Sequence, residues 1–287
     1  MSWNGRSLPL DQRTLVMGVV NVTPDSFSDG GLFSDPARAV EHGLAMAAAG
    51  ADILDVGGES TRPFSAPVSE QDELARVLPV ISGLASRVDV PISIDTSRAY
   101  VAEKALAAGA SIVNDVTALG GDPRMGRVAA EAGVPVILMH MLGTPRTMQV
   151  NPEYEDVVLD VRDFLSRAMD RAIAAGVRRE LILVDPGIGF GKTVEHNLLL
   201  IRNIAVLAEL GAPVVVGPSR KAFIRRILSE AGMTAAEDPR SRETEWGTQA
   251  VCAAAALAGA HVLRVHDVPR AVATLRITDA LARVTVH

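Results

Sequence analysis

Short apolar runs alternate with longer amphipathic stretches along almost the whole chain. The apolar runs are rich in β-branched residues and predict buried strands, whereas the amphipathic stretches predict helices. The predicted strands cover residues 15–20, 52–56, 91–95, 111–115, 134–139, 181–184, 212–217 and 261–265. The predicted helices cover residues 35–49, 69–86, 98–108, 124–132, 153–175, 195–210, a segment starting at 222, 248–257 and 269–283.

This pattern predicts an α/β protein with eight strand–helix units. Strands that are separated by helices pair in parallel through right-handed crossovers. Eight such units fit a closed (β/α)₈ barrel, the TIM barrel, better than an open sheet. The charged stretch 230–242 is predicted to be a surface loop. No change in composition divides the chain, so we predict a single domain over residues 1–287, with residues 1–14 as an N-terminal extension.

A polar or charged residue stands at or after the end of every predicted strand. In a barrel these positions converge on one face, where such enzymes build their sites. Cations there suit a phosphate or diphosphate, and a carboxylate beside an amide suits a nitrogen heterocycle. Taken singly, Asp95 or Asp185 could instead cap the helix that follows it, and Arg264 could be one half of an internal ion pair. The converging set is Asn21, Asp55, Thr61, Arg62, Asp95, Asn114, His140, Asp185, Ser219, Arg220, Lys221, Arg264 and His266.

Composition and charge exclude several other classes of protein. Only 3% of the 287 residues are aromatic, so the core must be aliphatic. The formal net charge is −6 and no Lys/Arg block occurs, which weighs against a nucleic-acid surface. The single cysteine, Cys252, precludes a disulfide framework. The start of the chain lacks the pattern of a signal peptide, and the apolar run 250–260 is too short to span a bilayer. We therefore expect a cytoplasmic protein without a membrane partner.

Residues 186–193, Pro-Gly-Ile-Gly-Phe-Gly-Lys-Thr, nearly spell a phosphate-binding P-loop. The first glycine of that pattern falls on Pro186, however, and the stretch follows the sixth predicted strand instead of the first. We interpret the stretch as a glycine-rich loop that lets the backbone approach a flat ligand.

Seven motifs carry a resemblance to a known family. They are MGVVNVTPDSFSDGG, DVGGESTRP, SIDTSR, IVNDV, DPGIGFGKT, GPSRKAFI and VLRVHDV, in order, between about residue 15 and about residue 282. The set resembles dihydropteroate synthase, a pterin-binding (β/α)₈ barrel of folate biosynthesis. The resemblance implies a transferase that joins 6-hydroxymethyl-7,8-dihydropterin diphosphate to 4-aminobenzoate and releases diphosphate. It also implies Mg²⁺, competition by sulfonamides, and a homodimer formed through the C-terminal helices.

The same resemblance implies a role for each matching residue. Asn21 would bind the Mg²⁺ that accompanies the diphosphate, and the loops 23–31 and 60–65 would close over the substrates. The diphosphate would meet Thr61, Arg264 and His266; the pterin would meet Asp95, Asn114, Asp185 and Lys221; and 4-aminobenzoate would lie beside Phe190, Ser219 and Arg220. Arg62, Met139 and Gly189 complete the substrate-binding set, and the catalytic residues would be Asp95, Asp185, Lys221, Arg264 and His266.

Two departures from the family pattern adjoin the expected 4-aminobenzoate position. Phe64 and Ser65 follow STRP where the family has Gly-Ala, and Pro218 precedes SRK where the family has Thr. These residues bear on arylamine affinity and on the response to sulfonamides.

Two other functions compete with this interpretation. A pterin-dependent methyltransferase would keep the Asp/Asn set but would not need the cations of SRK and RVH. A catalytically silent pterin-binding paralogue would have lost Asn21, Thr61, Lys221 or Arg264, and this chain retains all four.

Overall fold

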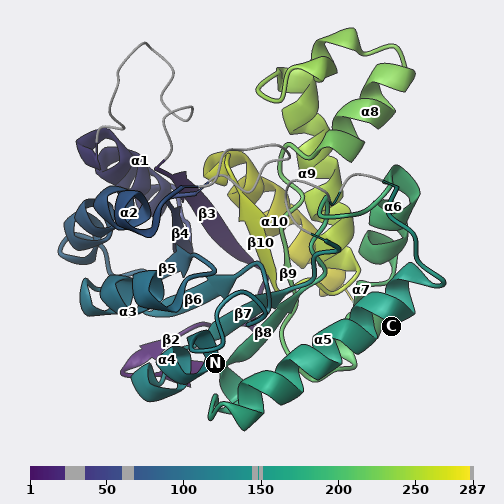
Figure 1. The fold of residues 1–287 in the computed structure, drawn as a ribbon. Helices are drawn as coiled ribbons and strands as arrows, with labels where there is room; N and C mark the ends of the chain where they lie inside the picture. The colour runs from purple at the N-terminus through teal and green to yellow at the C-terminus, as the bar shows by residue number, and fades with distance from the viewer. Residues whose placement is uncertain (23–35, 60–67, 144–147, 149–150, 285–287) are drawn as a thin grey trace.

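Eight parallel strands form one sheet that curves into a barrel in the computed structural model (Figure 1), which describes residues 1–22, 36–59, 68–143, 148 and 151–284. The strands pair in the order β8-β7-β6-β5-β4-β3-β10-β9. A parallel bridge between Val184 and Val214 joins the two ends, and Val184 N donates to Pro213 O at 3.0 Å. The predicted (β/α)₈ fold is confirmed.

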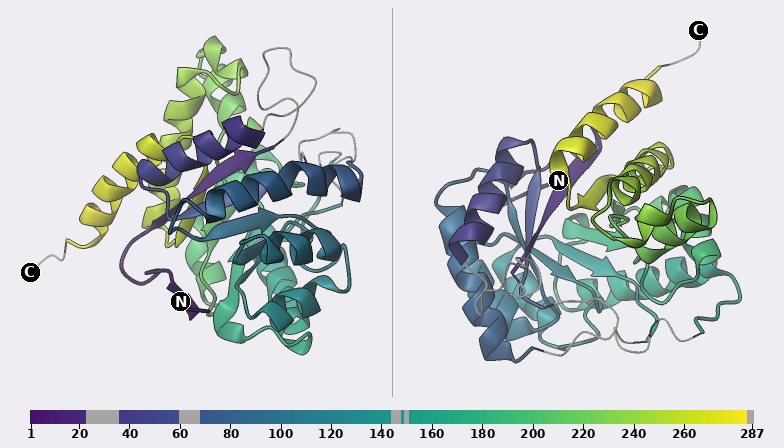
Figure 2. Two further views of the ribbon diagram at one scale, coloured as in Figure 1. Left: turned by 90° about the vertical axis from the view of Figure 1, so that its left-hand side faces the viewer. Right: turned by 90° about the horizontal axis from the view of Figure 1, so that it is seen from above.

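Helices follow the strands and surround them (Figures 1 and 2). The barrel strands are β3 (Leu15–Asn21), β4 (Ile53–Gly57), β5 (Ile92–Asp95), β6 (Ile112–Asp115), β7 (Val136–Met139), β8 (Ile182–Asp185), β9 (Val215–Val216) and β10 (Val262–Val265). The α-helices are α1 (Pro36–Ala48), α2 (Glu70–Ala85), α3 (Ala99–Ala107), α4 (Met125–Ala132), α5 (Val157–Ala174), α6 (Val194–Arg202), α7 (Ile204–Ala208), α8 (Ala222–Glu230), α9 (Arg242–Leu257) and α10 (Val268–Ala282). Two short 3₁₀ helices, η2 (Arg179–Leu181) and η3 (Thr234–Glu237), also occur among the described residues.

The core is aliphatic, as the composition requires. The largest fully buried side chains, among them Leu15, Met17, Ile53 and Leu54, are all leucine, isoleucine or methionine. Strands that are buried on both faces read as continuous apolar runs, which is why the pattern located them. Polar side chains gather at the carboxyl end of the barrel.

The N-terminal residues pack into this same core, which the pattern did not indicate. β1 (Ser2–Trp3) and β2 (Arg6–Ser7) form an antiparallel hairpin, and Trp3 is buried. Asn4 donates to the carbonyl of Ala132, and Arg6 donates to that of Asp89. Both carbonyls precede strands, so the hairpin covers the amino end of the barrel and leaves the carboxyl end open.

Two helices differ from their predicted bounds for local reasons. The predicted helix 195–210 is divided at Asn203, whose side chain donates to the Leu199 carbonyl and whose φ is −111°. The helix α9 starts at Arg242 instead of residue 248, because Ser241 Oγ accepts from Thr244 N and caps it. Of the first turn of α9 only Arg242 lies in the predicted loop 230–242, and residues 243–247 carried no prediction.

No helix in the described part of the chain is long and apolar enough to cross a membrane. The last helix, α10, projects from the edge of the molecule in both views of Figure 2.

Candidate active site

A cleft of about 810 Å³ opens at the carboxyl ends of the strands. Its walls come from β3, β5 and β10, from the loops that follow β8 and β9, and from α8. Thr61, Arg62, Phe64 and Ser65 lie outside the described residues, as do both predicted closing loops. The predicted site residues that line the cleft are Asn21, Asp95, Gly189, Phe190, Ser219, Arg220, Lys221, Arg264 and His266.

Arg264 stands at the centre of a buried ion-pair network, which we call the Arg264 network (Asp55, Asp95, Asn114 and Arg264). Its Nε donates to Asp55 Oδ2 at 2.6 Å, and its Nη2 donates to Asp95 Oδ2 at 2.7 Å. Asn114 Nδ2 donates to the same oxygen of Asp55 at 3.1 Å. The members come from four strands, so closure of the barrel assembles the network. Two carboxylates hold the guanidinium plane in one orientation.

The guanidinium of Arg264 still presents donors to the cleft. An arginine side chain carries five N–H donors, and the two ion pairs occupy two of them. The side chain is 21% exposed and lines the cleft. A planar fork of donors suits phosphate oxygens. Arg264 therefore has both of the roles that the sequence suggested. It belongs to an internal ion pair, and it also faces the cleft.

Asp185 ends β8 and is fixed by the loop that follows it, residues 186–193, which we call the β8–α6 loop. Asp185 Oδ1 accepts from Gly187 N at 2.7 Å. Gly187 has a φ of +66°, and a Cβ there would lie 1.9 Å from the carbonyl oxygen of His140, so only glycine fits. Gly189 N donates to Asn197 Oδ1 at 2.7 Å. These hydrogen bonds hold the backbone of the loop close to the cleft.

Phe190 presents its ring to the cleft beside a cation. Lys221 Nζ lies 3.9 Å from the centroid of the Phe190 ring, which is a cation–π contact. Met139 and Met148 pack with Phe190 in a small apolar cluster. An apolar wall next to an ammonium suits a flat aromatic ligand that carries negative charge.

The loop between β9 and α8 is tied to its neighbours by polar contacts. Ser219 Oγ lies 2.9 Å from His266 Nδ1 and accepts from His266 N at 3.2 Å. Arg220 has a φ of +59°, and its Nε lies 3.4 Å from Glu245 Oε2 on α9. Arg220 N donates to Thr248 Oγ1 at 3.1 Å. The predicted site residues of this loop are thereby held at the cleft.

Burial controls the protonation of the acids in the site. It raises the pKa of Asp185 to about 6, although the Gly187 N–H and the nearby cations lower it. Burial also raises the pKa of Asp95, against the lowering effect of Arg264. Burial lowers the pKa of Arg264, but Asp55 and Asp95 more than offset this, so Arg264 keeps its charge. With the pKa of Asp95 at about 7 and that of Asp185 at about 6, both acids titrate close to neutral pH.

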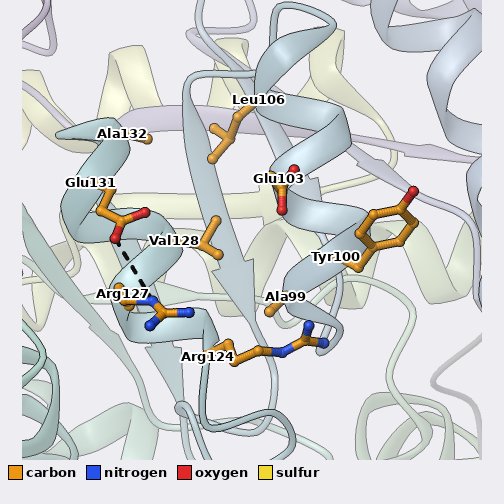
Figure 3. A pocket seen from close by; sticks show the side chains of 9 residues that line it. All are labelled: Ala99, Tyr100, Glu103, Leu106, Arg124, Arg127, Val128, Glu131 and Ala132. Atoms are coloured by element: carbon orange, nitrogen blue, oxygen red, sulfur yellow. Dashed lines mark ion pairs between the residues drawn. The ribbon is translucent and has the colours of Figure 1, made fainter.

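A second hollow, of about 290 Å³, lies on the outer surface between α3 and α4 (Figure 3). It is lined by Tyr100, Glu103 and Leu106 from α3 and by Arg127 and Glu131 from α4. Arg127 and Glu131 form an exposed ion pair at 3.7 Å. None of the predicted site residues lines this hollow, so the cleft at the carboxyl end is the candidate active site.

Comparison with known proteins identifies the family. Residues 17–266 match the pterin binding enzyme family. Over 272 residues the chain is 46% identical to the dihydropteroate synthase of Synechocystis sp., which covers 95% of this chain and 91% of that protein. The chain belongs to the dihydropteroate synthase family. The resemblance carried by the seven motifs is thus confirmed.

Solved structures of synthases from this family have the same fold. The Yersinia pestis dihydropteroate synthase in complex with a sulfonamide drug is 42% identical, with a TM-score of 0.91 over 99% of both chains. The Xanthomonas albilineans dihydropteroate synthase in complex with 7,8-dihydropteroate is 42% identical, with a TM-score of 0.85 over 98% of both chains.

Sequence reasoning gave no specific role to some residues that shape this synthase cleft. Asp55 was expected only as one of the polar strand ends, yet two members of the Arg264 network meet on its Oδ2. Lys192 was seen only as part of a false P-loop, but its ammonium donates to the Phe190 carbonyl. The available signal was a lysine next to a glycine-rich loop at a strand end. Nothing in the pattern pointed to Asn197 or Glu245, because their partners lie on other elements.

Proposed function

We propose that this chain condenses 6-hydroxymethyl-7,8-dihydropterin diphosphate with 4-aminobenzoate to give 7,8-dihydropteroate and diphosphate. The observation that carries the proposal is the composition of the cleft. It combines a buried carboxylate, a guanidinium whose ion pairs leave some of its N–H donors unused, and an aromatic side chain. Family membership and the product complex of the Xanthomonas albilineans relative support the same reaction.

The pterin ring would be held by Asp185, with Asp95 and Asn114 beside it. An ionised carboxylate accepts two parallel N–H donors, which matches the NH–C–NH₂ edge of a pterin. Asp185 Oδ1 accepts from Gly187 N, and the other carboxylate oxygen would accept from the ligand. Lys221, above the Phe190 ring, would lie against the ring system.

The diphosphate would be held by the donors of Arg264 that the ion pairs leave over, with His266 beside them. When the C–O bond to the diphosphate breaks, positive charge develops on the methylene carbon of the pterin. Asp95 and Asp185 would stabilise that charge electrostatically. The amine of 4-aminobenzoate forms the new C–N bond and loses a proton to solvent, so no protein nucleophile is needed.

Mg²⁺ would accompany the diphosphate. Asn21 stands half-buried at the end of β3 and lines the cleft, where its carboxamide oxygen is a suitable ligand. The described residues contain no cluster of three or more His, Cys, Asp or Glu side chains that could hold a metal ion. Mg²⁺ commonly binds through one or two protein oxygens together with substrate phosphates and water, so a single carboxamide at the cleft could serve as its protein ligand. Bound there, the ion would neutralise charge on the leaving diphosphate.

A three-component assay tests the reaction. The protein is incubated with dihydropterin diphosphate, Mg²⁺ and 4-aminobenzoate, and dihydropteroate and diphosphate are quantified. We expect equal amounts of both products, formed only when the arylamine is present. Asn21→Ala should need more Mg²⁺ for half-maximal rate. Failure to form dihydropteroate at any Mg²⁺ concentration would refute the proposal.

The same assay decides between the alternative functions. A silent paralogue would bind the pterin without releasing diphosphate. A pterin-dependent methyltransferase would bind a methylated pterin and ignore 4-aminobenzoate. The sulfonamide complex of the Yersinia pestis relative supports inhibition at the arylamine position, so a sulfonamide should compete with 4-aminobenzoate.

We also propose a homodimer through α9 and α10. Leu257 on α9 and Ile277 and Leu281 on α10 are each more than half exposed, and Ile277 and Leu281 share one helix face. Thr274 Oγ1 donates to Gln249 Oε1 at 2.9 Å, so the two helices that carry these exposed apolar side chains are packed against each other. Sedimentation should show a dimer for the wild type and a monomer for a chain carrying Ile277→Glu and Leu281→Glu. Leu159→Glu on α5 is the matched control, and an equal effect there would contradict the proposed interface.

The cytoplasmic location expected from the sequence stays a prediction. Fractionation of cells that express the chain would test it.

A further inference from the structure

Lys192 is a buried amine that the proposed reaction does not use, and burial lowers its pKa to about 7. It is only 3% exposed, although it belongs to the β8–α6 loop at the edge of the cleft. Its Nζ donates to the Phe190 carbonyl at 2.9 Å and lies 2.9 Å from His140 Nδ1. The described residues give this ammonium two neutral partners and no carboxylate within hydrogen-bond distance. Burying an ammonium in this way is unfavourable, so a compensating role is expected.

His140 is the acceptor that fixes the ammonium of Lys192. Burial lowers the pKa of His140 to about 3, and the charge of Lys192 lowers it further. The neutral ring can therefore accept at Nδ1 and carry its proton on Nε2. His140 is itself held at the end of β7, since its backbone N–H donates to Asp185 O and its ring packs edge-on against Phe164. Lys192 thus connects the β8–α6 loop to the neighbouring strand.

Phe190 is the residue through which this connection reaches the cleft. Its carbonyl accepts from Lys192, and its N–H donates to Gly187 O at 3.0 Å. Its ring lies under Lys221 Nζ. The peptide groups on both sides of Phe190 are therefore fixed, which sets the direction of the ring and the height of the Lys221 ammonium above it.

The next carbonyl of the loop is held in a different way. The hydroxyl of Tyr154 donates to Gly191 O at 2.7 Å, and the Tyr154 ring packs against His196. Tyr154 supplies one neutral hydrogen bond to this carbonyl, and it does not touch the Phe190 peptide. The loop therefore contains two adjacent tethers: Lys192 binds the Phe190 carbonyl, and Tyr154, whose ring also lies 6.0 Å from that of His140, binds the Gly191 carbonyl.

We propose that Lys192 is a positioning residue for the arylamine substrate. Its Nζ bridges the Phe190 carbonyl and His140 Nδ1 and so fixes the position of Phe190. The inference rests on the proposed function, in which Phe190 borders the 4-aminobenzoate position. Without the ammonium, the Phe190 carbonyl and His140 Nδ1 would both lose a buried donor, and the Phe190 ring would no longer have one orientation. The pterin contacts of Asp185 depend on Gly187 N, which Lys192 does not touch.

The test compares KM values for the two substrates in Lys192→Met, which keeps the apolar stem but removes the donor. We expect KM for 4-aminobenzoate to rise about tenfold while KM for dihydropterin diphosphate changes less than about threefold. Lys192→Gln can still donate to Phe190 O and should lie between Lys192→Met and the wild type. Tyr154→Phe removes the neighbouring tether and is the matched control, with both KM values expected to change less than about threefold.

Each other outcome overturns the proposal. A rise mainly in KM for the diphosphate substrate would mean that Lys192 binds the anion. Equal rises for both substrates, or the same selective rise in Tyr154→Phe, would mean that the loop as a whole is structural. If Lys192→Met does not fold, Lys192→Gln decides by the same comparison, and if neither folds, Lys192 is a folding residue. An inactive wild type would instead count against the proposed function, which separates the two failures.

Discussion

The two sides of the cleft are held together by different kinds of contact. In the Arg264 network, charged and amide side chains bind one another directly. In the β8–α6 loop, side chains mostly bind backbone groups, as Asp185 does with Gly187 N and Lys192 with Phe190 O. The first side depends on the barrel being closed, whereas the second depends on one loop being correctly shaped.

Because of this difference, we expect substitutions in the Arg264 network to lower the stability of the fold, and substitutions in the β8–α6 loop to weaken substrate binding. The hydrogen bonds that Asp55 and Asp95 receive in the network span 59 to 209 residues of sequence, so losing a member disturbs several strands and leaves a buried charge without a partner. The hydrogen bonds of Asp185 and Lys192 in the loop span 2 to 52 residues. Losing one of these should weaken a substrate contact and leave the barrel intact.

The largest effect is expected from Arg264→Ala. It leaves the carboxylates of Asp55 and Asp95 buried side by side without their cation, which should lower the free energy of unfolding by about 3–5 kcal/mol. Urea denaturation measures this loss. Arg264→Lys keeps a cation between the two acids and should lose clearly less. Equal losses for the two variants would mean that the ion pairs do not stabilise the fold.

Asp185→Asn should separate binding from stability. An amide offers one acceptor oxygen where the carboxylate offers two, so affinity for the dihydropterin alcohol should fall by about 2–4 kcal/mol. The free energy of unfolding at pH 7.5 should stay the same or rise, because a neutral amide is easier to bury than a carboxylate. Calorimetric titration and urea denaturation of the same samples give both values. Unchanged affinity for the pterin would refute the assignment of Asp185.

A change of pH should have a smaller effect, and its effect on pterin affinity should be opposite to its effect on stability. The pKa of Asp185 is about 6 in the folded chain, above its ordinary value, so the folded state binds the extra proton between about pH 4 and pH 6. This contribution to stability is complete below about pH 4 and is lost as the pH rises through about 6. Pterin affinity should behave inversely, falling up to tenfold per pH unit below about 6. Titration at several pH values checks this, and Asp185→Asn should remove the part of the dependence that is centred at about pH 6 and leave the part that Asp95, with a pKa of about 7, contributes.

The sequence was sufficient for the fold and for local parts of the site. The apolar runs located the barrel strands because those strands are buried on both faces. The loop motif around Gly187 could be recognised because its partners are close in sequence. The pairing of Asp55 with Arg264 could not, because it joins positions 209 residues apart and exists only once the barrel closes. The break at Asn203 and the start of α9 depend on single side-chain caps, which periodicity does not detect.

The most direct test of the account compares two ligands on two variants by calorimetry. The ligands are dihydropterin alcohol and dihydropterin diphosphate with Mg²⁺, and the variants are Asp185→Asn and Arg264→Lys. If Asp185 holds the ring and Arg264 the diphosphate, Asp185→Asn should weaken both ligands by the same factor. Arg264→Lys should weaken the diphosphate by about tenfold or more and leave the alcohol nearly unchanged. Equal losses for both ligands in Arg264→Lys would show that Arg264 is only structural and would contradict the account.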